Sequence, residues 1–135
     1  MYKVSVRISI ITATYNSAAT ISDTLRSVAS QDYSEIEHII VDGGSTDDTL
    51  SIVSQFPHVA RVISEKDNGI YDTMNKGLRV STGEIIGLLN SDDFYVSNTV
   101  ISQIVKKKQE KQMDSLYGGL IYAAQTIFKM TSTHI

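Results

Sequence analysis

Apolar residues follow two alternating patterns along this chain, and each pattern predicts a different element. Continuous apolar, β-rich runs predict strands over residues 8–14, 36–41, 59–64 and 84–89. Between and after these runs, apolar residues three or four positions apart predict helices, marked by Ile21, Leu25 and Val28; Leu50, Val53 and Phe56; Ile70, Met74 and Leu78; and Val100, Ile101, Ile104 and Val105. This alternation predicts an α/β fold, with a mainly parallel sheet, helices on both faces and right-handed crossovers.

Residues typical of turns and helix ends separate these elements. Ser17 or Thr20 can cap the first helix, and Ser45 with Asp48 three residues later forms an acidic variant of the capping box before the second. The remaining boundaries are marked by Pro57, Asp67-Asn68-Gly69, Gly83 and Asn98. The sequence therefore supplies a start or stop signal for each predicted helix.

Polar residues collect where the predicted strands end. The carboxyl ends of parallel strands meet at one edge of a sheet, so Thr14-Tyr15-Asn16, Asp42, Asp67 and Asp92-Asp93 should converge there. Two adjacent carboxylates such as Asp92 and Asp93 repel each other unless water, a metal ion or a hydrogen-bond donor compensates them. The alternative interpretation is a turn that caps the next segment, since Ser and Asp favour turns and helix starts.

Composition narrows the kind of protein. With 135 residues, 41% hydrophobic and 20% charged, the chain fits one soluble domain. It has no cysteine, which excludes disulfides and thiolate chemistry, and we expect a cytoplasmic location. A net charge of −3 argues against a nucleic-acid partner, while Lys106-Lys107-Lys108 and Lys111 leave peripheral membrane attachment open. The start of the chain has no signal-peptide pattern.

Two missing motifs narrow the classes of ligand that could bind at the carboxyl ends of the predicted strands. The turn after the first strand contains no glycine, so it lacks the Gly-x-Gly-x-x-Gly pattern of NAD and FAD sites, and a Walker phosphate loop is absent as well. A divalent ion that bridges carboxylate and phosphate oxygens is the other common solution, and the acidic pair suits it. Asp42 can accept hydrogen bonds from a base or ribose, or can be a turn aspartate beside Gly43-Gly44.

Four blocks occur in a characteristic order, namely Ser9–Asn16, Ile40–Asp47, Asn68-Gly69 to Asn75-Lys76-Gly77, and Gly83-Glu84 to Asp92-Asp93. This pattern resembles family 2 glycosyltransferases of the GT-A (Rossmann-like) fold, closely from about Val4 to Tyr95. The resemblance implies metal-dependent, inverting transfer of a sugar from a nucleoside diphosphate sugar, in the first place a UDP-sugar, to an acceptor hydroxyl. The acceptor would be a carbohydrate or a lipid-linked molecule.

The resemblance also implies a role for each matching residue. The donor site would comprise Thr14, Tyr15, Asn16, Asp42, Asp67, Asn75 and Asp92. Within it, Asp42 would contact the base, Asp92 would lie near the ribose and sugar, and Asp93 would coordinate the Mg²⁺ or Mn²⁺ that holds the diphosphate. Three positions depart from the common family pattern: Ala13 where many relatives have Pro, Gly43 where they have Asp, and Met74 where Arg is common.

The end of the chain has a weaker pattern, with extended stretches expected at Leu116–Tyr117 and Leu120–Ala124. We therefore expect a donor-binding domain over residues 1–112, and over 113–135 a tail or the start of a truncated acceptor half that exposes an apolar edge and favours a homodimer. The residues leave the catalytic base unknown, and we expect it beyond this chain. Two other interpretations remain open: a noncatalytic nucleotide-sugar-binding module, and an α/β interaction domain without a ligand.

Two further groups of polar residues have plain structural interpretations. Asp72, Lys76 and Arg79 share the polar face of the third helix, where Asp72 and Lys76 have the spacing of a surface ion pair. The three histidines are scattered along the chain, which favours surface or strand-packing roles.

Overall fold

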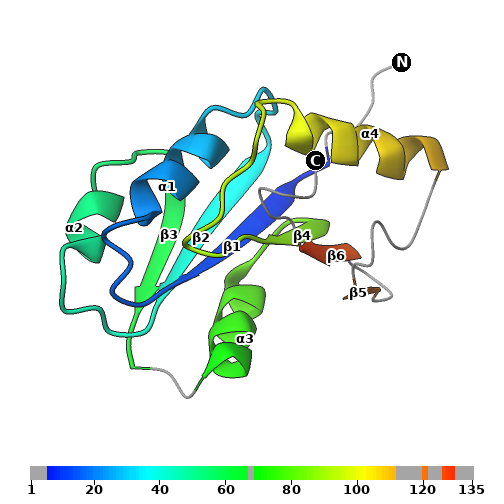
Figure 1. Ribbon diagram of the computed structural model, residues 1–135. Helices are drawn as coiled ribbons and strands as arrows, with labels where there is room; N and C mark the ends of the chain where they lie inside the picture. The colour runs from blue at the N-terminus through cyan, green and yellow to red at the C-terminus, as the bar shows by residue number, and fades with distance from the viewer. Residues whose placement is uncertain (1–5, 67–68, 112–119, 122–125, 130–135) are drawn as a thin grey trace.

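A sheet runs through the centre of the molecule with helices on both of its faces (Figure 1). The structure is a computed structural model, and it describes residues 6–66, 69–111, 120–121 and 126–129. The elements in these residues are β1 (Ile8–Thr14), α1 (Ile21–Ala29), β2 (Ile36–Asp42), α2 (Thr49–Val53), β3 (Val59–Ser64), α3 (Ile70–Val80), β4 (Ile85–Leu88), α4 (Val100–Lys111), β5 (Leu120–Ile121) and β6 (Thr126–Lys129). The strand order is β3-β2-β1-β4-β6-β5, with β5 antiparallel to β6 and the other neighbouring strands parallel.

The predicted α/β fold with a mainly parallel sheet is confirmed, and β1 to β4 lie where the apolar runs placed them. The strand β6 was not predicted. Its four residues are too few to show a periodicity, and its position depends on parallel pairing with β4. The stretch predicted over 120–124 begins as β5, whereas 122–124 and Leu116–Tyr117 lie outside the described residues. The expected division of the chain after residue 112 stays a prediction.

The start of α1 differs from the predicted cap. Thr20 is the N-cap residue, but its side chain makes no capping bond. Its hydroxyl donates instead to the backbone carbonyl of Ser91, at 2.9 Å. Ser17 contributes through its backbone carbonyl, which accepts from the N–H groups of Thr20 and Ile21. A tertiary contact has therefore taken the hydroxyl that a local cap would use.

The capping box predicted before α2 is wrong. Ser45 donates its hydroxyl to Asp42 Oδ1 at 2.6 Å, and the N-cap residue Asp48 makes no side-chain capping bond. The helix itself ends at Val53 rather than continuing to Pro57. A buried carboxylate at the end of β2 is a stronger acceptor than anything in the first turn of α2, so it recruits Ser45.

Each face of the sheet packs against its own helices, and the predicted inward positions of α1 and α4 are confirmed. Buried residues of these two helices are Ile21, Leu25, Val28, Val100, Ile101, Ile104 and Val105. The opposite face of the sheet, through Ile39 and Val41, packs against Leu78 and Val80 of α3. The carboxyl ends of β1, β2, β3 and β4 thus meet at one edge between two covered faces.

The start of β4 is held by hydrogen bonds among Ser9, Glu37 and Gly83, and the close packing at Gly83 requires a glycine. Gly83 donates its N–H to Ser9 Oγ at 2.8 Å, and Ser9 donates its hydroxyl to Glu37 at 2.7 Å. Glu37 also accepts from the N–H of Thr82 at 2.9 Å. A Cβ on Gly83 would lie 2.6 Å from Ser9 N and 2.8 Å from the Arg7 carbonyl oxygen. Two backbones would therefore have to move apart.

We expect Gly83→Ala to lower the free energy of unfolding by about 2–3 kcal/mol, because the added methyl group overpacks against main-chain atoms. Urea denaturation of both proteins measures the difference. Gly77→Ala is the matched control: the three atoms nearest to its Cβ, the closest at 2.7 Å, all belong to the side chain of Ile11 and not to the main chain. Alanine also favours the helix, so the loss should be smaller. If Gly83→Ala loses as little stability as Gly77→Ala or less, the close packing at Gly83 does not require a glycine.

A buried histidine of β2 and a half-buried histidine before β3 form a pair, in agreement with the predicted strand-packing role. His38 is fully buried, with Nε2 at 2.9 Å from Thr12 Oγ1 and Nδ1 at 3.0 Å from His58 Nε2. Burial, followed by repulsion from His58, lowers the pKa of His38 from 6.5 to about 3. Burial also lowers the pKa of His58.

This pair predicts a loss of stability in weak acid. The folded-state pKa of His38 lies below the unfolded value, so its contribution is present above pH 6.5 and falls as the pH drops toward 3. Between pH 7 and pH 5 we expect the free energy of unfolding to fall by about 2 kcal/mol for this one residue. Urea titrations at several pH values measure the slope. The same slope in His38→Gln, which cannot take up a proton, would contradict the assignment.

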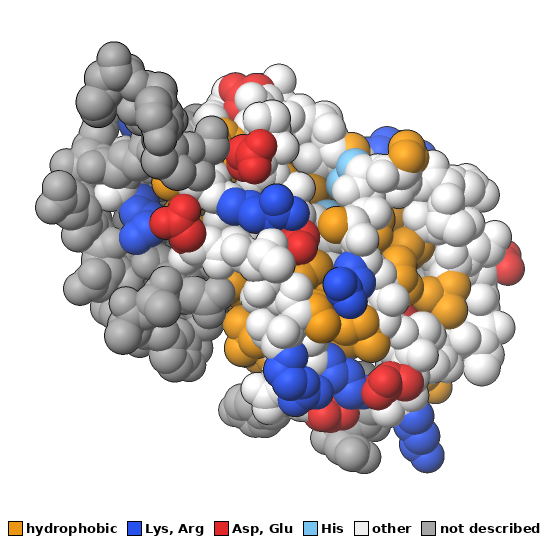
Figure 2. All heavy atoms as spheres, turned by 180° about the vertical axis from the view of Figure 1, so that it is seen from behind, with side chains coloured by type: hydrophobic (Ala, Val, Ile, Leu, Met, Phe, Trp, Pro, Cys, Tyr) orange, Lys and Arg blue, Asp and Glu red, His pale blue; other side chains and the backbone are white. Residues whose placement is uncertain are grey.

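The surface seen from behind carries charges of both signs. Lys and Arg side chains alternate with Asp and Glu, and hydrophobic side chains reach the surface between them (Figure 2). The described residues of this face therefore make no uniform positive field of the kind that nucleic acids bind. In the part of the chain that the structure describes, every helix is too short or too polar to span a membrane.

Candidate functional site

The carboxylate of Asp42 is the centre of a hydrogen-bond network at the ends of β1 and β2. Asp42 is fully buried. Its Oδ1 accepts hydrogen bonds from Thr14 Oγ1 at 2.7 Å and Ser45 Oγ at 2.6 Å. Its Oδ2 accepts from the N–H groups of Gly44 and Ser45, at 3.0 and 2.8 Å, and from Ser64 Oγ at 3.0 Å. These five donors fix the loop that follows β2.

Burial and hydrogen bonding act on the pKa of Asp42 in opposite directions. Burial, the largest single effect, raises the pKa, but the bonds from Ser45, Thr14 and Ser64 together lower it below its ordinary value of 3.8. Asp42 is therefore ionised at neutral pH. Its predicted contact with a base stays a prediction, since in the described structure its acceptor capacity is directed at protein donors.

Asn16 joins the loop after β1 to the loop after β2. Its φ of +49° lies in the left-handed region, which asparagine tolerates better than most residues. The Asn16 N–H donates to Ser45 Oγ at 2.7 Å, and its Oδ1 accepts from the N–H groups of Thr46 and Asp47 at 2.8 and 3.3 Å. The side chain of Asn16 thus holds the two loops together and sets the position of Tyr15.

Tyr15 stands beside a hollow of 390 Å³ between these loops. Its side chain is 62% exposed, which is unusual for an aromatic residue in an ordered loop. The other lining residues are Gly43, Gly44 and Lys66. Gly44 has φ +93°, and neither glycine carries a side chain that would fill the space. An aromatic ring, a cation and bare backbone together suit a flat, polar ring such as a nucleobase.

The acidic residues after β4 form a turn that α1 holds in place. The Asp93 N–H donates to the Asn90 carbonyl at 3.1 Å. The Ser91 carbonyl accepts from Thr20 Oγ1 at 2.9 Å and from Thr24 Oγ1 at 3.0 Å, and Thr24 Oγ1 also lies 2.5 Å from the Asp93 carbonyl. Because Thr24 is buried, this anchor is rigid and presents the Asp93 side chain at the edge of the sheet.

One further contact joins the acidic turn to the loop of Tyr15. Ser17 Oγ lies 2.9 Å from Ser91 Oγ. The loops after β1, β2 and β4 are therefore connected through hydrogen bonds, as the parallel sheet predicts. Among the residues predicted for the site, the network brings together Thr14, Asn16, Asp42 and the turn that carries Asp92 and Asp93.

The acidic turn suits a hard divalent cation that also binds phosphate. Asp92 is exposed and Asp93 is partly exposed, so their carboxylates can reach a ligand at this edge. The described residues contain no group of three or more His, Cys, Asp or Glu side chains that could enclose a metal by themselves. Mg²⁺ is typically bound through one or two carboxylates together with substrate phosphates. The residues present fit that arrangement, with Asp93 as the predicted ligand.

The predictions for residues in and just before α3 differ in their outcomes. Asp67 lies outside the described residues, and Asn75 is exposed on α3. The predicted ion pair between Asp72 and Lys76 is confirmed at 3.2 Å, but the solvated position expected for Lys76 is wrong. Its side chain is buried and its Nζ also lies 3.3 Å from Glu65 Oε1. Desolvation lowers the pKa of Lys76, and the bonds to Asp72 and Glu65 outweigh it and raise the pKa.

Sequence reasoning missed four residues that shape this site: Thr20, Thr24, Ser91 and Lys66. Thr20 and Thr24 are four positions apart on α1, so they share one helix face. A count of hydroxyl as well as apolar positions would have found that pattern. Lys66 carries no signal of this kind, because its place beside Tyr15 depends on how two loops meet.

Comparison with known proteins identifies glycosyltransferases as relatives of this chain. Residues 9–135 match the family described as Glycosyl transferase family 2. The chain is 39% identical over 107 residues to the Escherichia coli UDP-Glc:alpha-D-GlcNAc-diphosphoundecaprenol beta-1,3-glucosyltransferase WfaP, covering 77% of this chain and 42% of that protein. It is 36% identical over 118 residues to a Mycobacterium bovis PGL/p-HBAD biosynthesis glycosyltransferase, covering 84% of this chain and 46% of that protein. The chain thus spans less than half the length of these relatives.

Solved structures show the same architecture. Staphylococcus aureus TarS in complex with UDP-GlcNAc superposes with a TM-score of 0.74 at 26% identity, covering 86% of this chain and 37% of that one. The Pyrobaculum calidifontis mannosyltransferase PcManGT in complex with GDP-Man and Mn²⁺ gives a TM-score of 0.74 at 29% identity, covering 81% and 34%. The resemblance to the GT-A fold is confirmed by these neighbours.

Proposed function

Because this chain belongs to glycosyl transferase family 2, we propose that it binds a nucleoside diphosphate sugar, in the first place a UDP-sugar, where the loops after β1, β2 and β4 meet. The complete protein transfers the sugar to an acceptor hydroxyl with inversion. The observation that carries the proposal is the 2.9 Å contact between Ser17 and Ser91, which joins the loop of Tyr15 to the turn of Asp93. The aromatic ring of Tyr15 then binds the nucleobase, and the acidic turn binds the diphosphate of the same ligand through a divalent cation.

Each residue has a part in this proposal that follows from its contacts. Tyr15 stacks on the base in its hollow, and Asn16 and Thr14 hold the loop that carries it. Asp42 orients the nucleobase, either by direct contact or through the loop that it anchors. Asp92 lies toward the ribose and sugar, and Asp93 holds Mg²⁺ or Mn²⁺. A bound cation supplies the positive charge that stabilises the departing diphosphate.

Asp67 and Asn75 line the same donor pocket in this proposal. The names of similar proteins support the ligand classes: TarS is in complex with UDP-GlcNAc, and PcManGT with GDP-Man and Mn²⁺. The name of WfaP contains a diphosphoundecaprenol acceptor, which supports a carbohydrate or lipid-linked acceptor here. The protein then works in the cytoplasm, and the exposed Lys106 and Lys107 of α4 suit contact with an anionic membrane surface.

The test is calorimetric titration of UDP into the chain, in Mn²⁺ and again in EDTA. We expect UDP to bind tighter with Mn²⁺, because the cation links Asp93 to the diphosphate. UMP, which lacks the second phosphate, should gain less from the metal. Equal affinity in Mn²⁺ and EDTA would overturn the metal assignment, and no binding of UDP, GDP or CDP would favour an interaction domain. Metal-dependent binding without transfer by the complete protein would identify a noncatalytic nucleotide-sugar module.

A further inference from the structure

Among the described strands, β3 is one edge of the sheet. It pairs with β2 on one side, and Figure 1 shows it at the outer end of the strand order. The Glu65 N–H donates to the Asp42 carbonyl at 3.0 Å, so the backbone at residue 65 faces β2. In a parallel ladder, alternate residues direct both backbone groups to the same side. The N–H and C=O groups of Val62 and Ser64 therefore point away from the sheet.

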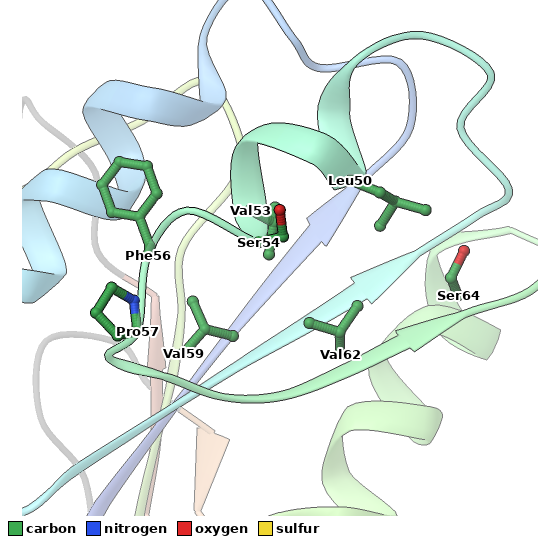
Figure 3. A pocket seen from close by; sticks show the side chains of 8 residues that line it. All are labelled: Leu50, Val53, Ser54, Phe56, Pro57, Val59, Val62 and Ser64. Carbon is green, nitrogen blue, oxygen red and sulfur yellow. The ribbon is translucent and has the colours of Figure 1, made fainter.

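An apolar groove borders this edge on the α2 face. Its volume is 490 Å³, and its lining residues are Leu50, Val53, Ser54, Phe56, Pro57, Val59, Val62 and Ser64. In Figure 3 the side chains of Val59 and Val62 point from the β3 segment toward α2, and Leu50 lies at the end of the groove nearer to Ser64. Val62 is 45% exposed. Within the described residues, the short α2 leaves this apolar surface uncovered, and no strand pairs with the outward backbone groups of Val62 and Ser64.

The α3 side of this edge carries two opposite charges four positions apart, Arg61 within β3 and Glu65 directly after its end. Arg61 is in register with Ile39, and Ile63 is in register with Val41, so both lie on the α3 side of the sheet. Glu65 directly follows β3, and its contact with Lys76 of α3 places its side chain on the same side. Arg61 is exposed, and Glu65 uses Oε1 for Lys76 while its side chain is 58% exposed. The two charges are thus symmetric about Ile63.

We propose that β3 pairs antiparallel with β3 of a second copy of this chain, with the twofold axis at Ile63. In this register Val62 of each copy lies opposite Ser64 of the other, and their outward backbone groups exchange hydrogen bonds. Arg61 of each copy lies opposite Glu65 of the other, so two ion pairs form. The two grooves become neighbours and their apolar linings meet.

The charges of Arg61 and Glu65 determine which strand can pair with β3 and in which register. An antiparallel partner satisfies Arg61 and Glu65 at once only if it carries an acid four positions after a base, and the segment 61–65 of a second copy does so. A shift of two residues in one direction sets Arg61 opposite Ile63 of the partner. A shift in the other direction sets Glu65 opposite Ile63. Both shifts leave a charge facing an apolar side chain, which disfavours them.

The test uses two variants with reversed charge, each of which repels itself. In Arg61→Glu two acids face each other across the axis, and in Glu65→Arg two bases do. Sedimentation velocity up to about 0.5 mM suits the weak association of an interface this small. We expect wild type to form dimers, and each variant to associate roughly tenfold to a hundredfold more weakly. Lys107→Glu on α4, away from β3, is the control for net charge, and we expect it to dimerise as strongly as wild type in sedimentation velocity.

Mixing the two variants is the decisive step, because their heterodimer restores both attractive pairs. We expect the mixture to form dimers at concentrations at which each variant alone is monomeric. Amide hydrogen exchange gives a second measurement without substitutions: the Val62 and Ser64 N–H groups of wild type should exchange more slowly as protein concentration rises. A monomeric wild type, variants that associate as wild type, or a mixture that stays monomeric would each overturn the proposal. If Glu65→Arg fails to fold, unchanged exchange at Val62 and Ser64 in wild type would overturn it.

Discussion

Replacing Asp93 with asparagine is expected to abolish the gain in UDP affinity that Mn²⁺ provides. Asp93 is the one metal ligand that the sequence predicts, and its backbone is fixed by Thr24 and Asn90, so a neighbouring residue cannot easily take its place. Asparagine keeps the size and the turn but removes the charge. Losing a ligand should cost more than the roughly 10–100-fold that changing a residue behind the ligands costs. Calorimetry with UDP in Mn²⁺ and in EDTA measures this.

A matched variant separates the metal effect from a general change of charge. Asp32→Asn makes the same substitution at an exposed residue in the loop after α1. We expect its UDP affinity to keep the full Mn²⁺ dependence. If Asp93→Asn also keeps it, Asp93 is not the ligand, and Asp92→Asn becomes the next variant to test. The thermal transition of Asp93→Asn should match that of wild type, because no buried contact of its side chain is lost.

Replacing Asp42 with asparagine is expected to lower the free energy of unfolding by about 3 kcal/mol, because the new amide group turns a donor toward other donors. The N–H groups of Gly44 and Ser45 and the Ser64 hydroxyl all need the acceptor at Oδ2. The loop behind Tyr15 should loosen as well, so nucleotide binding weakens together with stability. Urea denaturation measures the first effect and UDP titration the second.

Asp48→Asn is the control for this change, since Asp48 is exposed and makes no side-chain capping bond at α2. We expect it to leave the free energy of unfolding within about 0.5 kcal/mol of wild type. The difference between wild type and Asp42→Asn should also depend on pH. The folded-state pKa of Asp42 is depressed, so its contribution is present above the unfolded value of 3.8 and is lost as the pH falls through the folded value. A gap between the two proteins that stays constant down to pH 2 would contradict this account.

The site shows where prediction from residues reaches its limit. Ser45 has the sequence context of a helix cap, but a buried carboxylate three positions earlier recruits its hydroxyl. Lys76 has the position of a surface residue on α3, but the loop after β3 covers it and supplies Glu65. In both cases the prediction from the local pattern was wrong, because a partner outside the helix bound the side chain more strongly. Local propensities amount to fractions of a kcal/mol per residue, whereas bonds to buried charges contribute more.

The sequence by itself determined the strand–helix alternation, the positions of β1 to β4, the inward faces of α1 and α4, and the family, because apolar periodicity and the four motif blocks are properties of short segments. It also determined that Thr14, Asp42 and the acidic turn lie at one edge, since parallel strands leave no other arrangement. The tertiary structure alone decided that β6 extends the sheet beside β4, that Thr20 and Thr24 anchor the acidic turn, and that Lys66 stands by Tyr15. Each of these depends on a contact between residues far apart in the chain, and such contacts leave no period in the sequence.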